Sequence, residues 1–153
     1  MNALRSPAAA EAPLASGVRR TVVIAAGGTG GHFIPAEALG AELAARGHRV
    51  VLMTDARSGG ERSAVFAGPD AHVLRGAGLV GRGAGRAVRG ALALAAGTLQ
   101  ARRILARLRA DVVVGFGGYP SVPPVVAARL LRQRPRVILH EGNAVLGQAN
   151  RGL

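Results

Sequence analysis

The sequence contains no cysteine, no tryptophan and no lysine. Without cysteine there is no disulfide, no thiolate metal ligand and no cysteine nucleophile. Without lysine there is no Walker A phosphate loop, because that motif requires a lysine before its Ser or Thr. Any phosphate bound by this chain is therefore held without an ammonium side chain.

Aromatic residues make up only 3% of the sequence, so a core has to be built from Ala, Val, Leu and Ile. With 49% hydrophobic residues, the 153-residue chain suits one domain of ordinary size. No apolar run approaches the roughly 18 residues that would span a bilayer, and the best candidate, Ala91 to Leu99, is far too short. We therefore predict one domain over residues 19–153 that is soluble or peripheral to a membrane.

The first 18 residues contain Ala, Pro and Ser and lack the apolar core of a secretion signal. We predict that residues 1–18 form a disordered extension. The histidines show no close ligand spacing, so we predict no metal site. They are His32, His48, His72 and His140.

Five apolar stretches read as strands, and helical patterns stand between most of them. The predicted strands are Thr21–Ala26, Arg49–Thr54, Ala71–Leu74, Asp111–Gly115 and Arg136–His140. The predicted helices include Pro35–Arg46 and Arg86–Arg109, and one starts at Val122. This alternation predicts an α/β fold with a parallel, doubly wound, Rossmann-like sheet.

Ligands of such sheets bind at the carboxyl ends of the strands. Three of these ends carry unusual residues, in Gly27–His32, Gly115–Ser121 and His140–Asn143. We therefore expect these three segments to converge in space.

The first of these segments has four glycines within five residues, Gly27, Gly28, Gly30 and Gly31. Glycine can take positive φ and bring its N–H close to a ligand, and the following helix adds unpaired N–H groups and its dipole. Phosphate or diphosphate is the expected ligand. The alternative is a tight turn without a ligand.

A dinucleotide loop is a second alternative, with Asp55 at the end of the second strand as the ribose-binding acid. Phe33 stands where the G-x-G-x-x-G motif requires its last glycine. An NAD-dependent enzyme is therefore disfavoured.

Three motifs in this order, Gly27–His32, Gly117–Ser121 and Leu139–Ala144, resemble the N-terminal half of the MurG family of peptidoglycan N-acetylglucosaminyltransferases. The resemblance covers about residues 19–153. It implies the N-terminal domain of a GT-B glycosyltransferase that binds a lipid-linked muramyl-pentapeptide pyrophosphate acceptor. A C-terminal domain, absent here, would hold most of the donor UDP-GlcNAc. The resemblance implies inverting transfer without metal or cofactor.

The chain ends at Leu153, where another helix pattern is developing, so it looks truncated. We expect little or no activity without a donor domain, supplied in cis or by a partner in trans. A non-catalytic phosphate- or nucleotide-binding module is the alternative function.

By the same resemblance, His32 is the candidate general base for the muramyl 4-hydroxyl, and imidazole is the side chain that titrates nearest neutral pH. The alternative is a histidine that only hydrogen-bonds a phosphate or the backbone. Thr29, Gly30 and Gly31 are expected to line the cleft that faces the donor, and Gly28 is expected to bind substrate in the same loop.

At the third motif, Asn143 either contacts the donor or caps a helix that starts near Ala144. Glu141 either orients a neighbour or binds a hydroxyl, and His140 is open to a packing role. The family usually has Gln where this chain has Gly142.

The second glycine loop is expected to bind the diphosphate together with the first through Gly117 and Gly118. Ser121 caps the following helix, binds a phosphate oxygen or does both, and Tyr119 either packs or contacts the ligand.

The segment 71–110 carries eight arginines and no acid, beside apolar residues such as Leu79 and Val80. A solvated helix face and nucleic-acid binding are alternatives, but the few aromatics give bases no stacking platform. We favour contact with an anionic membrane surface and predict no nucleic-acid partner. By the resemblance, the location is peripheral, at the cytoplasmic face of the bacterial inner membrane.

Overall fold

A computed structural model of the chain describes residues 18–27, 30–56, 63, 65–66, 70–75 and 84–142. The predicted disordered extension, residues 1–18, lies outside this part of the chain except for Val18. The segment 76–83, which includes Leu79 and Val80, lies outside it as well, and so does the predicted helix near Ala144.

Five strands form one all-parallel sheet in the order β3-β2-β1-β4-β5. They are β1 (Thr21–Ala25), β2 (Arg49–Asp55), β3 (Ala71–Leu74), β4 (Val112–Gly115) and β5 (Arg136–Leu139). The prediction of a parallel, doubly wound α/β sheet is confirmed, with strand ends within one residue of those expected. Short runs rich in Val, Ile and Leu are typical of parallel strands buried on both faces.

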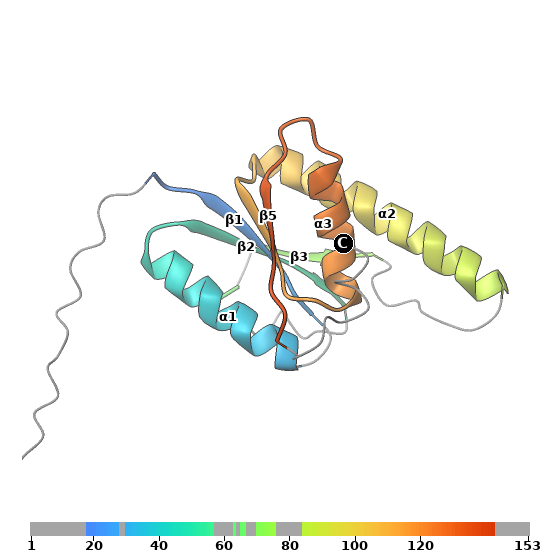
Figure 1. Cartoon of the computed structure of the whole chain (residues 1–153), viewed down its shortest axis with the longest axis horizontal. Coiled ribbons are helices and arrows are strands. Elements are labelled where there is room, and N and C mark those ends of the chain that lie inside the picture. The colour runs from blue at the N-terminus through green and yellow to red at the C-terminus, as the bar shows by residue number, and fades with distance from the viewer. Residues whose placement is uncertain are drawn as a thin grey trace, which may run out of the picture.

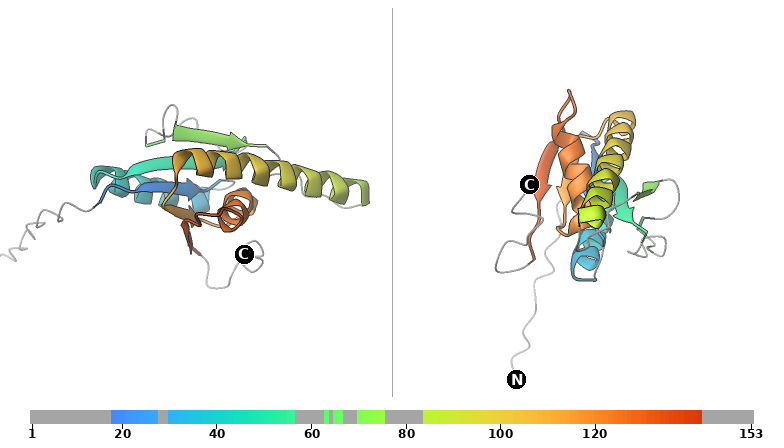
Figure 2. Two further views of the ribbon diagram at one scale, coloured as in Figure 1. Left: turned by 90° about the horizontal axis from the view of Figure 1, so that it is seen from above. Right: turned by 90° about the vertical axis from the view of Figure 1, so that its right-hand side faces the viewer.

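Helices cover both faces of the sheet: α1 (Gly30–Ala45) on one face, α2 (Ala84–Leu108) and α3 (Val122–Arg129) on the other. A short 3-10 turn, η3 (Tyr119–Ser121), leads into α3. Figure 1 shows the strands between α1 and the α2–α3 pair, and the two further views in Figure 2 show the same layering.

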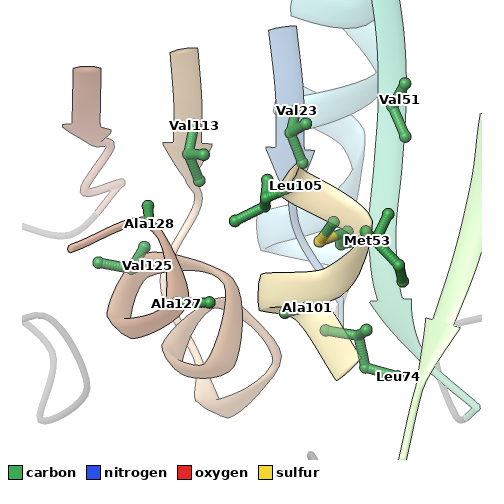
Figure 3. Packing of buried hydrophobic residues seen from close by; sticks show 11 residues of the cluster. Val23, Val51, Met53, Leu74, Ala101, Leu105, Val113, Val125, Ala127 and Ala128 are labelled. Carbon is green, nitrogen blue, oxygen red and sulfur yellow. The ribbon is translucent and has the colours of Figure 1, made fainter. Parts of the chain in front are cut away.

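The core on the α2–α3 face is built from small and branched side chains. Figure 3 shows Val23, Val51 and Val113 of the sheet facing Leu105 of α2 and Val125 of α3. Fully burying one such side chain contributes roughly 1.5–3 kcal/mol to folding. This face therefore fixes α2 and α3 on the sheet without any aromatic residue.

On the other face, Phe33 of α1 and Phe66 meet edge to face, with their ring centroids 6.3 Å apart at 70°. Phe66 is almost fully buried, and the Ser63 hydroxyl accepts its amide hydrogen bond at 3.3 Å. Ser63 in turn donates to Glu37 of α1 at 2.5 Å. Ser63 and Phe66 are thus held against α1.

The predicted start of the first helix at Pro35 is wrong, because α1 begins at Gly30. Pro35 therefore lies in the helix interior and has no N–H to donate to the Gly31 carbonyl. Packing of Phe33 and Ala36 against the sheet outweighs the weak helix propensity of the glycines.

The edge strand β3 is held to α2 by the side chain of Gln100. The Gln100 amide accepts a hydrogen bond from the Arg75 amide at 3.0 Å and donates to the Val73 carbonyl at 3.2 Å. Nearby, Gly97 brings α2 close to the β3 backbone, since a Cβ there would lie 2.6 Å from the Arg75 carbonyl oxygen. Among the described helices, none, α2 included, combines the length and apolar character needed to cross a bilayer.

We predict opposite effects for two glycine-to-alanine changes in α2. Gly97→Ala should lower the free energy of unfolding by about 1–3 kcal/mol, because the methyl group meets a backbone carbonyl. Gly85→Ala, where a Cβ has open space, should raise it by about 0.5–1 kcal/mol through helix propensity. Urea unfolding of both variants measures the difference. Equal effects would contradict the close packing at Gly97.

Candidate functional site

The strand order changes direction between β1 and β4, and the two glycine segments follow these two strands. In open α/β sheets, ligands bind in the crevice at such a switch point, beyond the carboxyl ends of the strands. The register pairs Ala25 with Gly115, and the Phe116 amide donates to the Ala25 carbonyl at 2.9 Å. The sheet therefore ends both strands at the same level and starts both loops side by side.

The second loop has two positions whose backbone conformation only glycine adopts without strain. Gly117 and Gly118 have φ of 83° and 69°, in the region that L side chains rarely adopt. The loop closes on itself through Ser121, whose hydroxyl donates to the Gly118 carbonyl at 2.8 Å and whose amide donates to it at 3.2 Å.

Ser121 is fully buried and stands at the N-cap position of α3, but its side chain makes no capping hydrogen bond, so the capping alternative is wrong for the hydroxyl. Its hydroxyl is used for the Gly118 carbonyl, a contact that holds the loop in shape. Tyr119 is 47% exposed at the head of the turn, so its side chain is accessible and does not belong to the core.

The two loops lie against each other through His32, in the first turn of α1. An ideal Cβ on Gly118 would lie 3.8 Å from His32 Cδ2 and 4.0 Å from the Gly27 carbonyl oxygen. His32 is partly exposed, and Gly30 and Gly31 stand directly before it at the start of the helix. The predicted convergence of the first and second segments is therefore observed.

Backbone amides at this edge are available to an anion. Within the described residues, the amides of Gly118 and Tyr119 have no backbone acceptor. The first residues of α1, Gly30 and Gly31, lie where helical amides lack an intrahelical partner. Both sets lie at the carboxyl edge of the sheet, where the α1 dipole adds partial positive charge.

The third segment joins the same edge through β5. The His140 amide donates to the Gly115 carbonyl at 2.8 Å, and the His140 ring stacks on Phe116 with centroids 4.7 Å apart at 30°. Phe116 is buried and supports the stack. His140 thus has the packing role that the sequence left open, and the part played by Phe116, between two glycines of the loop, was missed.

Glu141 and Gly142 follow at the same edge, and Glu141 is partly buried. A Cβ on Gly142 would only approach His140 Cε1, at 3.9 Å. Three predicted site residues, Gly28, Thr29 and Asn143, lie outside the described residues. In the described ranges, no three His, Asp or Glu side chains gather as a metal site would require.

A dinucleotide loop does not fit this geometry. Phe33 of α1 stands at the position of the third glycine of that motif, and its ring packs against Phe66. Asp55 ends β2 in a buried position, at 4% exposure. The aromatic contact replaces the close helix–strand approach that the third glycine would allow.

The all-parallel sheet, its strand order and the helices on both of its faces define a Rossmann-like domain whose switch point lies between β1 and β4. The chain belongs to glycosyltransferase family 28, because the model of that family's N-terminal domain matches residues 22–153.

A curated relative from Acidiphilium cryptum is 65% identical over 132 residues, which cover 86% of this chain and 36% of that protein. A relative from Granulibacter bethesdensis is 60% identical over 133 residues, covering 87% of this chain and 35% of that protein. Both are named UDP-N-acetylglucosamine--N-acetylmuramyl-(pentapeptide) pyrophosphoryl-undecaprenol N-acetylglucosamine transferase. The chain thus spans about a third of the length of these relatives.

Solved structures agree. The crystal structure of Acinetobacter baumannii MurG is similar with a TM-score of 0.70 and 30% identity, covering 87% of this chain and 38% of that one. A calicheamicin glycosyltransferase shares the fold, with a TM-score of 0.58 and 23% identity over 86% of this chain and 34% of that one. The resemblance to the MurG family is thereby confirmed.

We predict that Gly118→Ala lowers the free energy of unfolding by about 1–2 kcal/mol, because φ of 69° is unfavourable for alanine. Gly142→Ala at the same edge is the matched control and should change stability by less than about 0.5 kcal/mol. Urea unfolding followed by circular dichroism measures both. Equal stability of the two variants would show that the turn does not need its left-handed glycine.

Proposed function

We propose that this chain is the acceptor-binding domain of an inverting N-acetylglucosaminyltransferase of peptidoglycan synthesis. The donor is UDP-N-acetylglucosamine, and the acceptor is the N-acetylmuramyl-pentapeptide pyrophosphoryl lipid that the relatives' names print. Residues 19–153 form this domain, and a donor domain in cis or in trans completes the site. The assembly works at the cytoplasmic face of the bacterial inner membrane as a peripheral protein.

The observation that carries the proposal is the contact between the two glycine loops at the switch point, with His32 between them. Main-chain amides of two adjacent loops suit the doubly charged pyrophosphate of the acceptor. This arrangement needs no lysine, and the chain has none. Membership of glycosyltransferase family 28 supports the same reaction class.

The reaction needs a base on one side and charge stabilisation on the other. The acceptor hydroxyl loses a proton as its oxygen attacks the anomeric carbon, while negative charge gathers on the departing nucleoside diphosphate. In the proposal, His32 takes the proton. The amides of Gly118, Tyr119 and the first turn of α1 face anionic oxygens, and Gly117 gives the second loop its turn.

The donor side is completed by residues near the start of α1 and the end of β5. Gly28, Thr29, Gly30 and Gly31 face the donor, and Asn143 donates to and accepts from its hydroxyls. Glu141 orients a neighbour or binds a hydroxyl. Ser121 acts on the acceptor through the shape of the loop, since its hydroxyl is bound to the Gly118 carbonyl.

We predict that His32→Ala lowers kcat by about 100-fold or more with little change in the donor KM. The assay uses the Acidiphilium cryptum relative with its matched segment replaced by that of this chain, and follows transfer of labelled N-acetylglucosamine. His48→Ala is the matched control, because His48 precedes β2 at the opposite edge of the sheet, where it accepts the Arg20 amide.

An unchanged kcat for His32→Ala would show that His32 is not the general base. Absence of transfer by the unsubstituted chimera, with intact binding of the acceptor, would favour a non-catalytic phosphate-binding module instead.

The proposed membrane contact is supported by an exposed apolar stripe on α2. Val88, Leu92 and Leu99 are 60%, 66% and 45% exposed and recur at helical spacing. Arg89 and Arg103 are exposed beside them on the same helix. Apolar side chains with flanking arginines suit the interface of an anionic bilayer.

We predict that the chain binds vesicles containing phosphatidylglycerol and that binding weakens with salt. Leu92→Glu should reduce the bound fraction several-fold, because it places a like charge and a polar group at the interface. Leu130→Glu, at another exposed leucine beyond α3, is the control. Sedimentation with vesicles measures both, and no binding at low salt would contradict the contact.

A further inference from the structure

A second cationic feature lies at the opposite edge of the sheet from the glycine loops. It is a cleft of about 830 Å³ between the last turns of α2, the amino ends of β4 and β5, and the segment 131–135. In Figure 1 the connection from α3 to β5 and the end of α2 lie at the top, whereas the first turn of α1 lies at the bottom. Its volume falls in the range of small-molecule sites.

The lining of this arginine cleft is strongly one-sided in charge. Six arginines stand against a single acid, Asp111; they are Arg20, Arg102, Arg109, Arg132, Arg134 and Arg136. The remaining lining is largely apolar and includes Leu105, Val112 and Leu131. No Phe, Tyr or Trp lines the cleft, so it offers no stacking surface for nucleobases.

Asp111 is already engaged. Its carboxylate accepts the Thr21 amide at 2.8 Å and Arg20 Nη1 at 3.2 Å. The Thr21 amide and then the Arg20 guanidinium hold the pKa of Asp111 below its usual value. Among the described residues, the other five arginines of the cleft have no acidic partner.

Arg109 is held in a conformation that normally calls for glycine. Its φ is 48°, and it is the one residue other than glycine with positive φ in the described part of the chain. The end of α2 has the Schellman pattern: the Arg109 amide donates to Ala106 at 3.3 Å and the Ala110 amide to Leu105 at 3.2 Å.

The end of α1 provides the comparison within the same molecule. There the Gly47 amide donates to Ala44 at 2.9 Å and the His48 amide to Leu43 at 3.1 Å, and Gly47 has φ of 82°. The same cap is thus built once with glycine and once with arginine. This backbone conformation would be less strained with glycine at position 109, so the arginine there lowers the stability of the folded chain.

We propose that the arginine cleft is a second phosphate-binding site, for a ligand with two or more negative charges and an apolar part. One guanidinium group can donate two parallel hydrogen bonds to two phosphate oxygens. The five arginines without an acidic partner among the described residues call for a ligand with more negative charge than one carboxylate carries. The apolar lining suits the organic part of a phosphate ester. The site is separated from the glycine loops by the length of the strands and does not depend on the proposed transfer activity.

The test uses the 153-residue chain and inorganic pyrophosphate at low salt, followed by amide chemical shifts in NMR. We expect saturable shifts at residues 109–112 and 131–136, in addition to any at the glycine loops. Arg109→Gly should raise the Kd for pyrophosphate, measured from the shifts at the cleft, by about ten-fold. The same change should raise Tm by about 2–4 °C, because it relieves the left-handed backbone. A loss of binding through unfolding is thereby excluded.

Arg129→Gln is the matched control for net charge, since Arg129 is exposed at the end of α3 and does not line the cleft. It should leave Kd at the cleft within about two-fold. Gly118→Ala should alter shifts at the glycine loops and leave those at the cleft unchanged.

A second arm separates a lipid headgroup from a soluble phosphate. Vesicles with phosphatidic acid are compared with pyrophosphate, using Leu92→Glu to remove the apolar contact of α2. Loss of vesicle binding in Arg109→Gly, without pyrophosphate shifts in the unsubstituted chain, would assign the site to a lipid phosphate. No effect of Arg109→Gly on either probe would overturn the proposal.

Discussion

The parallel pairing of β1 with β4 is the constraint on which the rest of the site depends. Because Ala25 is in register with Gly115, both strands end at one level and the two glycine loops start beside each other. A shift of the register by two residues would move one loop by about 7 Å relative to the other. His32 would then no longer lie beside Gly118, and the two loops would no longer start side by side.

In the two proposed sites, the two edges of the sheet offer anions different chemistry. At the carboxyl edge, amides fixed by glycine turns and a helix start provide directed donors without net charge. At the amino edge, guanidinium groups provide net charge on flexible side chains. Neither edge uses an ammonium group, because the sequence has no lysine. Fixed amides suit a site in which oxygens must be placed for reaction, whereas guanidinium groups suit one in which charge is held.

The strands, their parallel order and the three convergent segments were predictable because each follows from short-range pattern. Buried parallel strands appear as apolar runs, and glycine loops after them are visible in the sequence. The start of α1 was not predictable, because the glycines at residues 30 and 31 disfavour a helix locally. Packing of Phe33 on Phe66 decides it, and that contact joins segments far apart in the chain.

The amino-acid sequence alone determined the fold class and the glycine loops, because these depend on apolar periodicity and on where glycine stands, and it excluded lysine from any proposed phosphate site. Only the tertiary structure decided that Ser121 supports the Gly118 carbonyl, that His140 stacks on Phe116, and that six arginines from separate segments line one cleft. These are contacts between positions that the sheet order brings together. Sequence spacing carries no information about them until the strands are paired.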